Sequence, residues 1–156
     1  MIKHFTFNHF GVNCYLIVDE ASRQCAIVDP AMEANYEDAQ LVQYLTSSSL
    51  QVCHILLTHA HVDHIAGLRQ SCERFNLPVT MHDDGKKLLR QAEAYGSIMG
   101  FNVENMEDLP TIHADEGTLL KCGNIEIECR FVPGHCPGSL CFVIPSEMAV
   151  LTGDAL

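Results

Sequence analysis

The sequence is poor in basic residues. Among its 156 residues, Lys and Arg number nine against 20 Asp and Glu, which gives a formal net charge of −11. Such a chain repels phosphate backbones, so we expect no nucleic-acid partner. It also lacks the run of about 18 apolar residues that a membrane-spanning helix requires. Its first residues lack the apolar core of a signal peptide. We therefore expect neither nucleic acid nor membrane among its partners.

No C-x-x-C pair occurs among the eight cysteines, which are dispersed and mostly lie inside apolar runs. This scatter favours reduced, buried thiols over a disulfide framework, and with it a cytoplasmic location. The length and the 47% hydrophobic content predict one domain, residues 1–156, with a core of its own.

Apolar runs separated by turn signals predict a mixture of strands and helices. We expect helices at 36–46 and around 68–75, and a third, capped by Asp83 or Asp84, that runs through Leu88 and Leu89 to Tyr95. Residues 96–116 show no regular pattern and are expected to form a loop. The mixture indicates an α+β fold of stacked sheets with helices outside. Strands are expected at 5–7, 13–18, 25–28, 52–57, 77–81, 118–121, 125–132, 139–144 and 148–152.

The most informative segment is THAHVDH, residues 58–64, which contains three imidazoles and a carboxylate. It follows the apolar run 52–57 and precedes a helix-like pattern, so it is expected to form a loop at a strand end. Imidazole nitrogens and carboxylate oxygens suit zinc, and also iron or manganese. His59 and His61 alternate along the chain. Asp63 and His64 are adjacent and must point differently, as two neighbouring metals would require.

Two further segments place ligand-type residues at strand ends. PGHCPG, residues 133–138, has two prolines and two glycines that build a rigid loop around His135. TGD, residues 152–154, ends another apolar strand with the carboxylate of Asp154, a candidate bridge between metals. Beside His135, a packing role for Cys136 is favoured over a soft ligand or a redox-sensitive thiol.

In this order, THAHVDH, PGHCPG and TGD resemble the metallo-β-lactamase fold superfamily, most closely its compact hydroxyacylglutathione hydrolase (glyoxalase II)-like group. The resemblance implies an αββα sandwich with metals at the sheet edges. It further implies that members continue beyond the TGD strand to a late histidine. The chain ends at Leu156, so we interpret it as truncated in its second half, with an exposed sheet edge open to association. By position, the first metal would be held by His59, His61 and His135, the second by Asp63 and His64, and both by Asp154.

The resemblance implies a hydrolase for thioesters such as hydroxyacyl-glutathione. Two divalent ions, zinc foremost, would share a hydroxide that attacks the carbonyl, with Asp63 orienting it. A persulfide dioxygenase is the first alternative, with one iron on His59 or His61, His135 and Asp154. The second is a fragment that binds metal without turnover. The remaining histidines are assigned no role: His4, His9, His54, His82 and His113.

Overall fold

Two β-sheets, stacked face to face, contain all the strands of the computed structural model, which describes residues 1–156. The first sheet has the order β1-β2-β3-β4-β5-β6, and the second has the order β10-β9-β8-β7. The first sheet contains β1 (Ile2–Phe7), β2 (Val12–Asp19), β3 (Gln24–Val28), β4 (Gln51–Leu56), β5 (Val79–Met81) and β6 (Thr111–His113). The second contains β7 (Leu119–Cys122), β8 (Ile125–Phe131), β9 (Leu140–Ile144) and β10 (Ala149–Leu151).

The mixed pairing of the first sheet determines where its loops emerge. Strands β1, β2 and β3 pair antiparallel, whereas β3, β4, β5 and β6 pair parallel. The second sheet is antiparallel throughout. Because parallel strands end at the same edge of a sheet, the segments that follow β4, β5 and β6 lie side by side.

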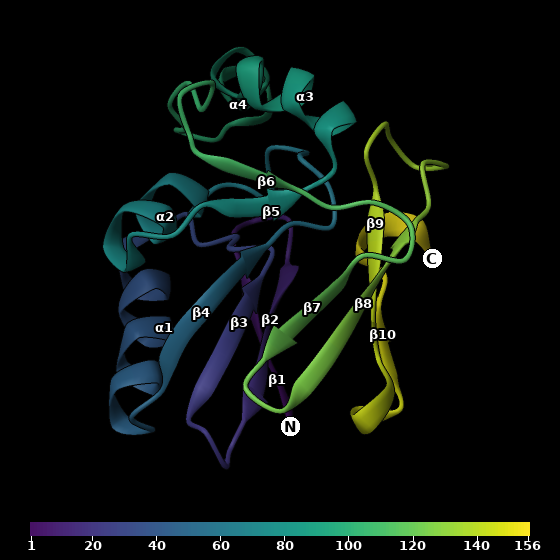
Figure 1. Cartoon of the computed structure of the whole chain (residues 1–156). Helices are drawn as coiled ribbons and strands as arrows, with labels where there is room; N and C mark the ends of the chain where they lie inside the picture. The colour runs from purple at the N-terminus through teal and green to yellow at the C-terminus, as the bar shows by residue number, and fades with distance from the viewer.

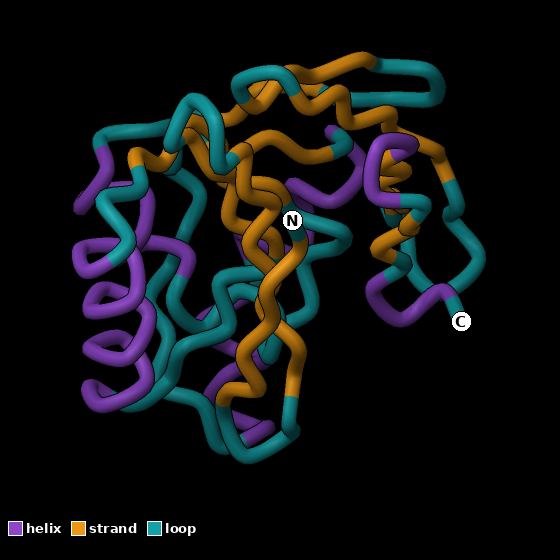
Figure 2. The backbone as a smooth tube through the Cα atoms, turned by 90° about the horizontal axis from the view of Figure 1, so that it is seen from below, coloured by secondary structure: helices purple, strands orange, loops and turns teal.

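Helices cover only one face of the first sheet (Figure 1). Helix α1 (Asn35–Ser47) packs there, and Figure 2 shows it standing at one side of the strands. Helix α2 (Leu68–Phe75) packs beside the end of β4, near the short helices α3 (Lys86–Arg90) and α4 (Ala92–Met99).

Alternation along β2 separates the two main layers of the core. Leu16 points into the layer beneath α1, together with Leu41 of that helix. The next residue, Ile17, points into the layer between the sheets, where it joins Ile127 and Phe142. The central strands β2 and β3 are therefore buried on both faces, which explains their nearly continuous apolar runs.

The second sheet has helices on neither face: its inner face packs on the first sheet and its outer face is open. Along β8, Ile125 and Ile127 are buried, whereas Glu126 and Arg130 are exposed. Strand β10 is at the edge of this sheet and pairs with β9 alone. Of the four layers in an αββα sandwich, these residues form three: helix, sheet and sheet.

Most expected elements are present within one or two residues of their predicted bounds, but the region 83–116 differs. The predicted capping by Asp83 or Asp84 is wrong: the side chain of His82 accepts a hydrogen bond from the Asp84 backbone N–H (3.1 Å). The single helix expected from this cap to Tyr95 is divided at Gln91 into α3 and α4.

The expected loop at 96–116 is also corrected. It begins with the end of α4 and contains β6, which pairs parallel with β5. Strand β6 has only three residues and no buried position, so it carries no apolar alternation that a sequence pattern could show. It forms because β5 offers it a free edge.

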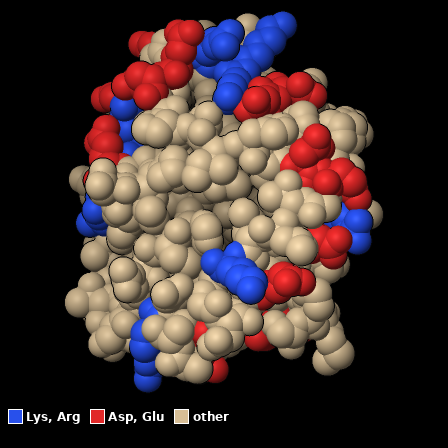
Figure 3. Space-filling view, in the orientation of Figure 1, with Lys and Arg blue, Asp and Glu red and all other residues tan.

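None of the helices is long and apolar enough to cross a membrane. On the face seen in Figure 3, Lys and Arg occur in small groups beside Asp or Glu, without a broad basic patch.

A buried carboxylate fixes the turn between β1 and β2 to the start of α1. Glu37 accepts hydrogen bonds from the backbone N–H groups of Asn8 (2.6 Å), Glu33 (2.8 Å) and Ala34 (3.0 Å). The side chain of Asn8 then donates to the carbonyls of Ala31 (2.9 Å) and Asp63 (2.8 Å). The turn is thereby tied to the His-rich loop.

We predict that Glu37→Ala lowers the free energy of unfolding by roughly 2–4 kcal/mol, because three backbone donors lose their acceptor. Urea unfolding followed by circular dichroism would measure the loss. Gln40→Ala, an exposed position on the same helix, is the control and should change stability by less than about 0.5 kcal/mol. Equal stability of the two variants would contradict this account of the turn.

Candidate metal centre

Three loops meet at the edge where β4 ends. The His-rich loop follows β4, the His135 loop connects β8 to β9, and a turn after β10 carries Asp154. The Leu140 backbone N–H donates to the carbonyl of Thr58 (2.7 Å), which joins the second sheet to the His-rich loop. A Cβ on Gly138 would lie 2.5 Å from the backbone nitrogen of Gly85. The His135 loop therefore packs closely on the segment that precedes α3.

The first ligand group consists of His59, His61 and His135. One ring nitrogen from each lies within 4.8 Å of the others. Nε2 of His135 is 3.0 Å from Nδ1 of His61. Nε2 of His59 is buried without a hydrogen-bond partner. A buried polar atom is normally satisfied, so this free nitrogen, aimed at two other imidazoles, fits a metal ion.

Neighbouring groups fix the protonation of His59. The Thr58 hydroxyl donates to Oδ2 of Asp29 (2.6 Å), so it accepts, at 3.0 Å, the proton on Nδ1 of His59. Nε2 of His59 is then the unprotonated nitrogen. Metal-binding histidines characteristically have such an orienting partner on the second ring nitrogen.

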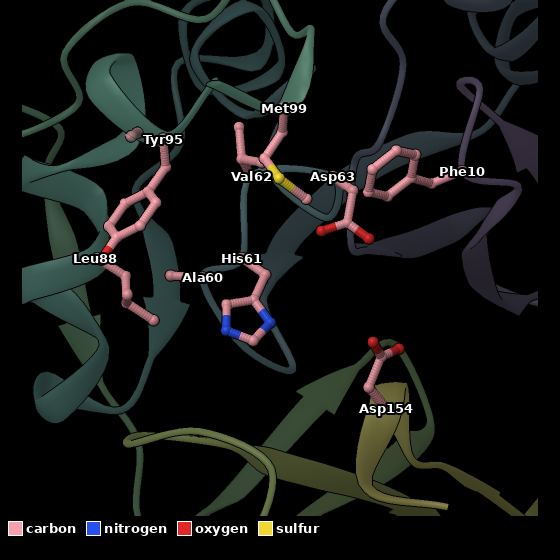
Figure 4. Close-up of a pocket in the computed structure, with 10 residues that line it drawn as sticks. Phe10, Ala60, His61, Val62, Asp63, Leu88, Tyr95, Met99 and Asp154 are labelled. Atoms are coloured by element: carbon pink, nitrogen blue, oxygen red, sulfur yellow. The ribbon is translucent and has the colours of Figure 1, made fainter. Parts of the chain in front are cut away.

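The second ligand group combines His64 with Asp154. Nε2 of His64 lies 3.2 Å from Oδ1 of Asp154 and 3.7 Å from Oδ2 of Asp63. Nδ1 of His64 donates to the buried Asp29 at 2.9 Å, so Nε2 is the nitrogen without a proton when the ring is neutral. Asp63 lies at the border of this group, and Figure 4 shows its carboxylate facing that of Asp154 across an opening beside His61.

The pKa values of the histidines follow from burial and charge. Burial, with three imidazoles nearby, lowers the pKa of His59 to about 2. Burial and the proximity of His135 also lower the pKa of His61. For His64, burial acts to lower the pKa, but the hydrogen bond and charge of Asp29, together with the charges of Asp63 and Asp154, raise it overall. The imidazoles of His59 and His61 are thus neutral at pH 7, the form that binds metal.

The structure therefore brings together all six residues that the sequence singled out, and it adds two that were missed. The sequence pattern predicts no role for Asp29 or Thr58, although these two residues orient the rings of His59 and His64. A polar residue directly after a buried strand, at the edge that carries the ligands, is the signal that could have identified Asp29.

A separate group is formed by His82, His113 and Asp115. Nδ1 of His82 accepts from the backbone of Asp84 (3.1 Å), and Nδ1 of His113 accepts from that of Asp83 (3.3 Å). Because Nδ1 accepts in both rings, Nε2 carries a proton, and it faces Asp115 at 3.6 Å from His82 and 3.9 Å from His113. A metal would need that nitrogen unprotonated, so this group fits a structural role.

The surroundings of Cys136 favour the packing role. Its side chain is buried, and its sulfur lies 3.3 Å from the hydroxyl of Ser139. Burial raises the pKa of the thiol, which keeps it protonated and unreactive at neutral pH.

Comparison with known proteins places this geometry in a family. Residues 8–156 match the family described as the metallo-beta-lactamase superfamily. The chain belongs to the metallo-β-lactamase superfamily. In solved structures, it is similar to a B3 metallo-β-lactamase with a TM-score of 0.85 and 25% identity, covering 100% of this chain and 73% of that one. The expected α+β metallo-β-lactamase fold is thus confirmed.

Curated relatives include enzymes of different activity. A probable metallo-hydrolase of Bacillus subtilis is 35% identical over 145 residues, covering 92% of this chain and 65% of the relative. A hydroxyacylglutathione hydrolase of Haemophilus influenzae is 30% identical, covering 94% and 68%. The human mitochondrial persulfide dioxygenase is 30% identical, covering 91% and 47%. The chain thus spans about two thirds of the bacterial relatives and about half of the human one.

These matches support a metalloenzyme of the hydrolase superfamily that binds divalent metals. One structure, described as a di-iron-bound form, shares 26% identity and a TM-score of 0.80, covering 95% of this chain and 69% of that one. That similar structure holds iron, and the imidazole and carboxylate donors of this site also suit zinc.

We predict that His59→Ala and His135→Ala each remove the tightly bound metal, because each deletes one of three imidazoles of the first group. The affinity should fall by more than the ~10–100-fold that loss of an outer partner causes. Metal per chain, measured by mass spectrometry after dialysis, decides this. His4→Ala, on an exposed ring outside the site, should keep its metal. An unchanged number of metal ions per chain in both ligand variants would contradict the assignment of His59 and His135 as ligands.

We predict that Asp29→Asn weakens metal binding ~10–100-fold at the His64 group. The amide of asparagine would donate to Nδ1 of His64 and shift the ring proton to Nε2, which blocks that nitrogen. Competition with a chromophoric chelator measures the affinity. Asp108→Asn, an exposed carboxylate, is the control. A similar melting temperature for both variants separates this effect from unfolding. Wild-type affinity in Asp29→Asn would show that the carboxylate does not set the tautomer.

Proposed function

We propose that the chain is a metal-dependent hydrolase that cleaves thioesters. The observation that carries this is the position of Asp154 between the two ligand groups. Its Oδ1 lies 3.2 Å from Nε2 of His64, and its Oδ2 lies 3.6 Å from Nε2 of His135. A carboxylate that reaches both groups suits two neighbouring metals, zinc foremost and iron or manganese as alternatives.

The residues present fit such a centre. His59, His61 and His135 would hold the first ion, and Asp63 and His64 the second. When bound, the divalent ions supply Lewis acidity, which polarises a carbonyl and lowers the pKa of water towards neutrality.

The protein's own groups would orient the reactants. The carboxylate of Asp63 faces the opening opposite Asp154 and is placed to hold and direct a nucleophilic water (Figure 4). Its backbone is fixed by the amide of Asn8, which donates to its carbonyl at 2.8 Å. Asp29 and Thr58 keep the imidazoles of His64 and His59 in one tautomer. This rigidity supports catalysis because ligand positions need not reorganise during the reaction.

The thioester part of the proposal comes from the resemblance to the glyoxalase II-like group and from the relative in Haemophilus influenzae. Hydroxyacyl-glutathione is the example that this resemblance offers. A thiolate is a good leaving group, so attack on the carbonyl is the step that needs the most assistance. The enzyme would act on a small molecule, without nucleic acid or membrane, in the cytoplasm. Association through the edge strand β10 is part of the same proposal.

The second candidate is an iron-dependent persulfide dioxygenase, as the human and other relatives are named. His61, His135 and Asp154 favour it, because two imidazoles 3.0 Å apart and a carboxylate 3.6 Å from one of them would serve a single iron. The third candidate is a metal-binding chain without turnover.

Metal content and a reaction assay on the same preparation discriminate among these candidates. Two metals per chain, together with thioester cleavage measured as the release of free thiol, support the hydrolase. One iron with oxygen consumption on a persulfide supports the dioxygenase. Metal binding with neither reaction supports the third candidate and contradicts our proposal.

We predict that Asp63→Asn retains the first metal but lowers kcat for thioester hydrolysis by roughly 10²–10³-fold. The isosteric amide cannot take up a proton or bind the second metal as a carboxylate does. Steady-state kinetics with metal in excess measure this loss, and metal analysis checks retention. Asp115→Asn, in the separate histidine group, is the matched control and should keep wild-type rates. Full activity of Asp63→Asn would remove Asp63 from the mechanism.

A further inference from the structure

A cavity of about 500 Å³ opens directly beside the metal centre. Its charged members, Asp63 and Asp154, belong to the centre, as does the imidazole of His61. The other residues of the lining are apolar or aromatic: Phe10, Ala60, Val62, Leu88, Ala92, Tyr95 and Met99. No Lys or Arg lines the cavity. The part of a substrate that extends away from the metals therefore meets uncharged walls.

One wall is a stripe along the two short helices. Ala92, Tyr95 and Met99 follow one another at intervals of three and four residues, so they lie on one side of α4, and Leu88 of α3 lines the same cavity. In Figure 4, Tyr95 and Met99 face the opening from the side opposite Asp154. Tyr95 and Met99 remain 49% and 44% exposed. The stripe thus presents apolar surface that the fold itself does not bury.

The opposite wall is Phe10, at the tip of the turn between β1 and β2. Its ring is 49% exposed and contacts Phe101 edge to face, with centroids 5.3 Å apart. The preceding residue, His9, bonds to Glu33 (2.8 Å) and to the carbonyl of Met99 (3.4 Å). These contacts fix the position of the Phe10 turn relative to the end of α4. The space between Phe10 and the stripe on α3 and α4, called the slot below, therefore has walls that are held in place by packing.

Helix α3 carries three basic residues, Lys86, Lys87 and Arg90, and none of them lines the cavity. Lys86 pairs with Asp83 at 2.7 Å, and Arg90 pairs with Glu107 at 3.5 Å. A short hydroxyacyl group would leave this apolar surface in water, whereas an apolar group would cover it. Biological thiols such as glutathione carry carboxylates, which these walls would not pair. The acyl part of the substrate is therefore the part that the slot fits.

We propose that the slot between Phe10 and the α3–α4 stripe binds an apolar acyl chain, aliphatic or aromatic, and so selects such thioesters over short hydroxyacyl ones. This inference rests on the proposed function, because it assigns the acyl side of the same hydrolysis. It makes Met99 and Tyr95 specificity residues that contact substrate without taking part in the chemistry.

A chain-length series tests the selection. Acetyl, lactoyl, butyryl, hexanoyl and octanoyl thioesters of one neutral thiol, N-acetylcysteamine, are assayed with the metal-loaded protein. We expect kcat/KM to rise about two- to fourfold per methylene, since each buried methylene adds transfer free energy. The lactoyl thioester should be among the poorest substrates. A flat series, or a preference for lactoyl, would overturn the inference while leaving thioester hydrolysis intact.

Two variants on one helix locate the binding surface. Met99→Lys places a charge in the slot, at the end of α4 where a cation is tolerated. We expect it to lower kcat/KM for the octanoyl thioester at least ~10-fold and for the acetyl thioester less than ~2-fold. Ile98→Lys, 79% exposed and outside the slot, is the control and should match the wild type. Equal effects of both variants would contradict the assignment.

Binding gives a readout that does not depend on turnover. The thioether S-octyl-N-acetylcysteamine cannot be hydrolysed, and its Kd can be measured by calorimetry beside that of the S-ethyl compound. Tighter binding of the octyl compound to wild type and Ile98→Lys, and its loss in Met99→Lys, would support the slot. If this pattern appeared with no thioester cleaved, the proposed hydrolysis would fail and the slot would stand. No octyl preference would overturn the slot.

Discussion

The buried carboxylate of Asp29 is the group on which the metal centre depends. It is 1% exposed and ends β3 with a positive φ of 52°. One oxygen accepts from the backbone N–H of Thr58 (2.7 Å), and the other accepts from the Thr58 hydroxyl (2.6 Å) and from Nδ1 of His64 (2.9 Å). A buried charge is costly unless it is well hydrogen-bonded, and three charge-assisted bonds satisfy this one. The same bonds set the tautomers of His64 and, through Thr58, of His59. The hydrogen bonds that satisfy the buried carboxylate therefore also prepare two candidate ligands for metal binding.

Thr58 extends this constraint to the second sheet. Its carbonyl accepts from Leu140 at the start of β9. A Cβ on Gly153 would lie 2.4 Å from its hydroxyl oxygen, so the turn that carries Asp154 approaches as closely as only glycine permits. Each ligand group therefore draws on both sheets. The two sheets must be stacked in one register before His135 and Asp154 reach the histidines that follow β4, and the core around Phe142 provides that register.

The sequence predicted the strands with strong apolar runs, the helix at 36–46 and the six candidate ligands, because each has a local pattern. Periodicity reports burial of a continuous element, and the ligand motifs are short and rich in one residue type. The features that the sequence did not predict depend on contacts between residues distant in sequence. Strand β6 pairs with the edge of β5, a contact that no local pattern announces. His82 provides the capping side chain, although the adjacent aspartates Asp83 and Asp84 are the usual capping residues. The role of Asp29 became visible only when Thr58 and His64 were placed around it. The slot beside the ligand groups required the turn of Phe10 and helix α4, which are 82 or more residues apart in sequence, to face each other.

Metal binding and folding should be coupled at this centre. The neutral imidazoles of His59 and His61 cannot supply positive charge at neutral pH, because burial lowers both pKa values. The carboxylates of Asp63 and Asp154 face one another across the opening (Figure 4), and His64, whose pKa is raised, offsets only part of their charge. The chain as a whole already has a net charge of −11. Divalent cations would relieve this repulsion and fill the space around the unpaired nitrogen of His59. Since the ligands come from loops of both sheets, an ion that binds them also holds the sheets together. Its binding free energy then contributes to the stability of the folded state.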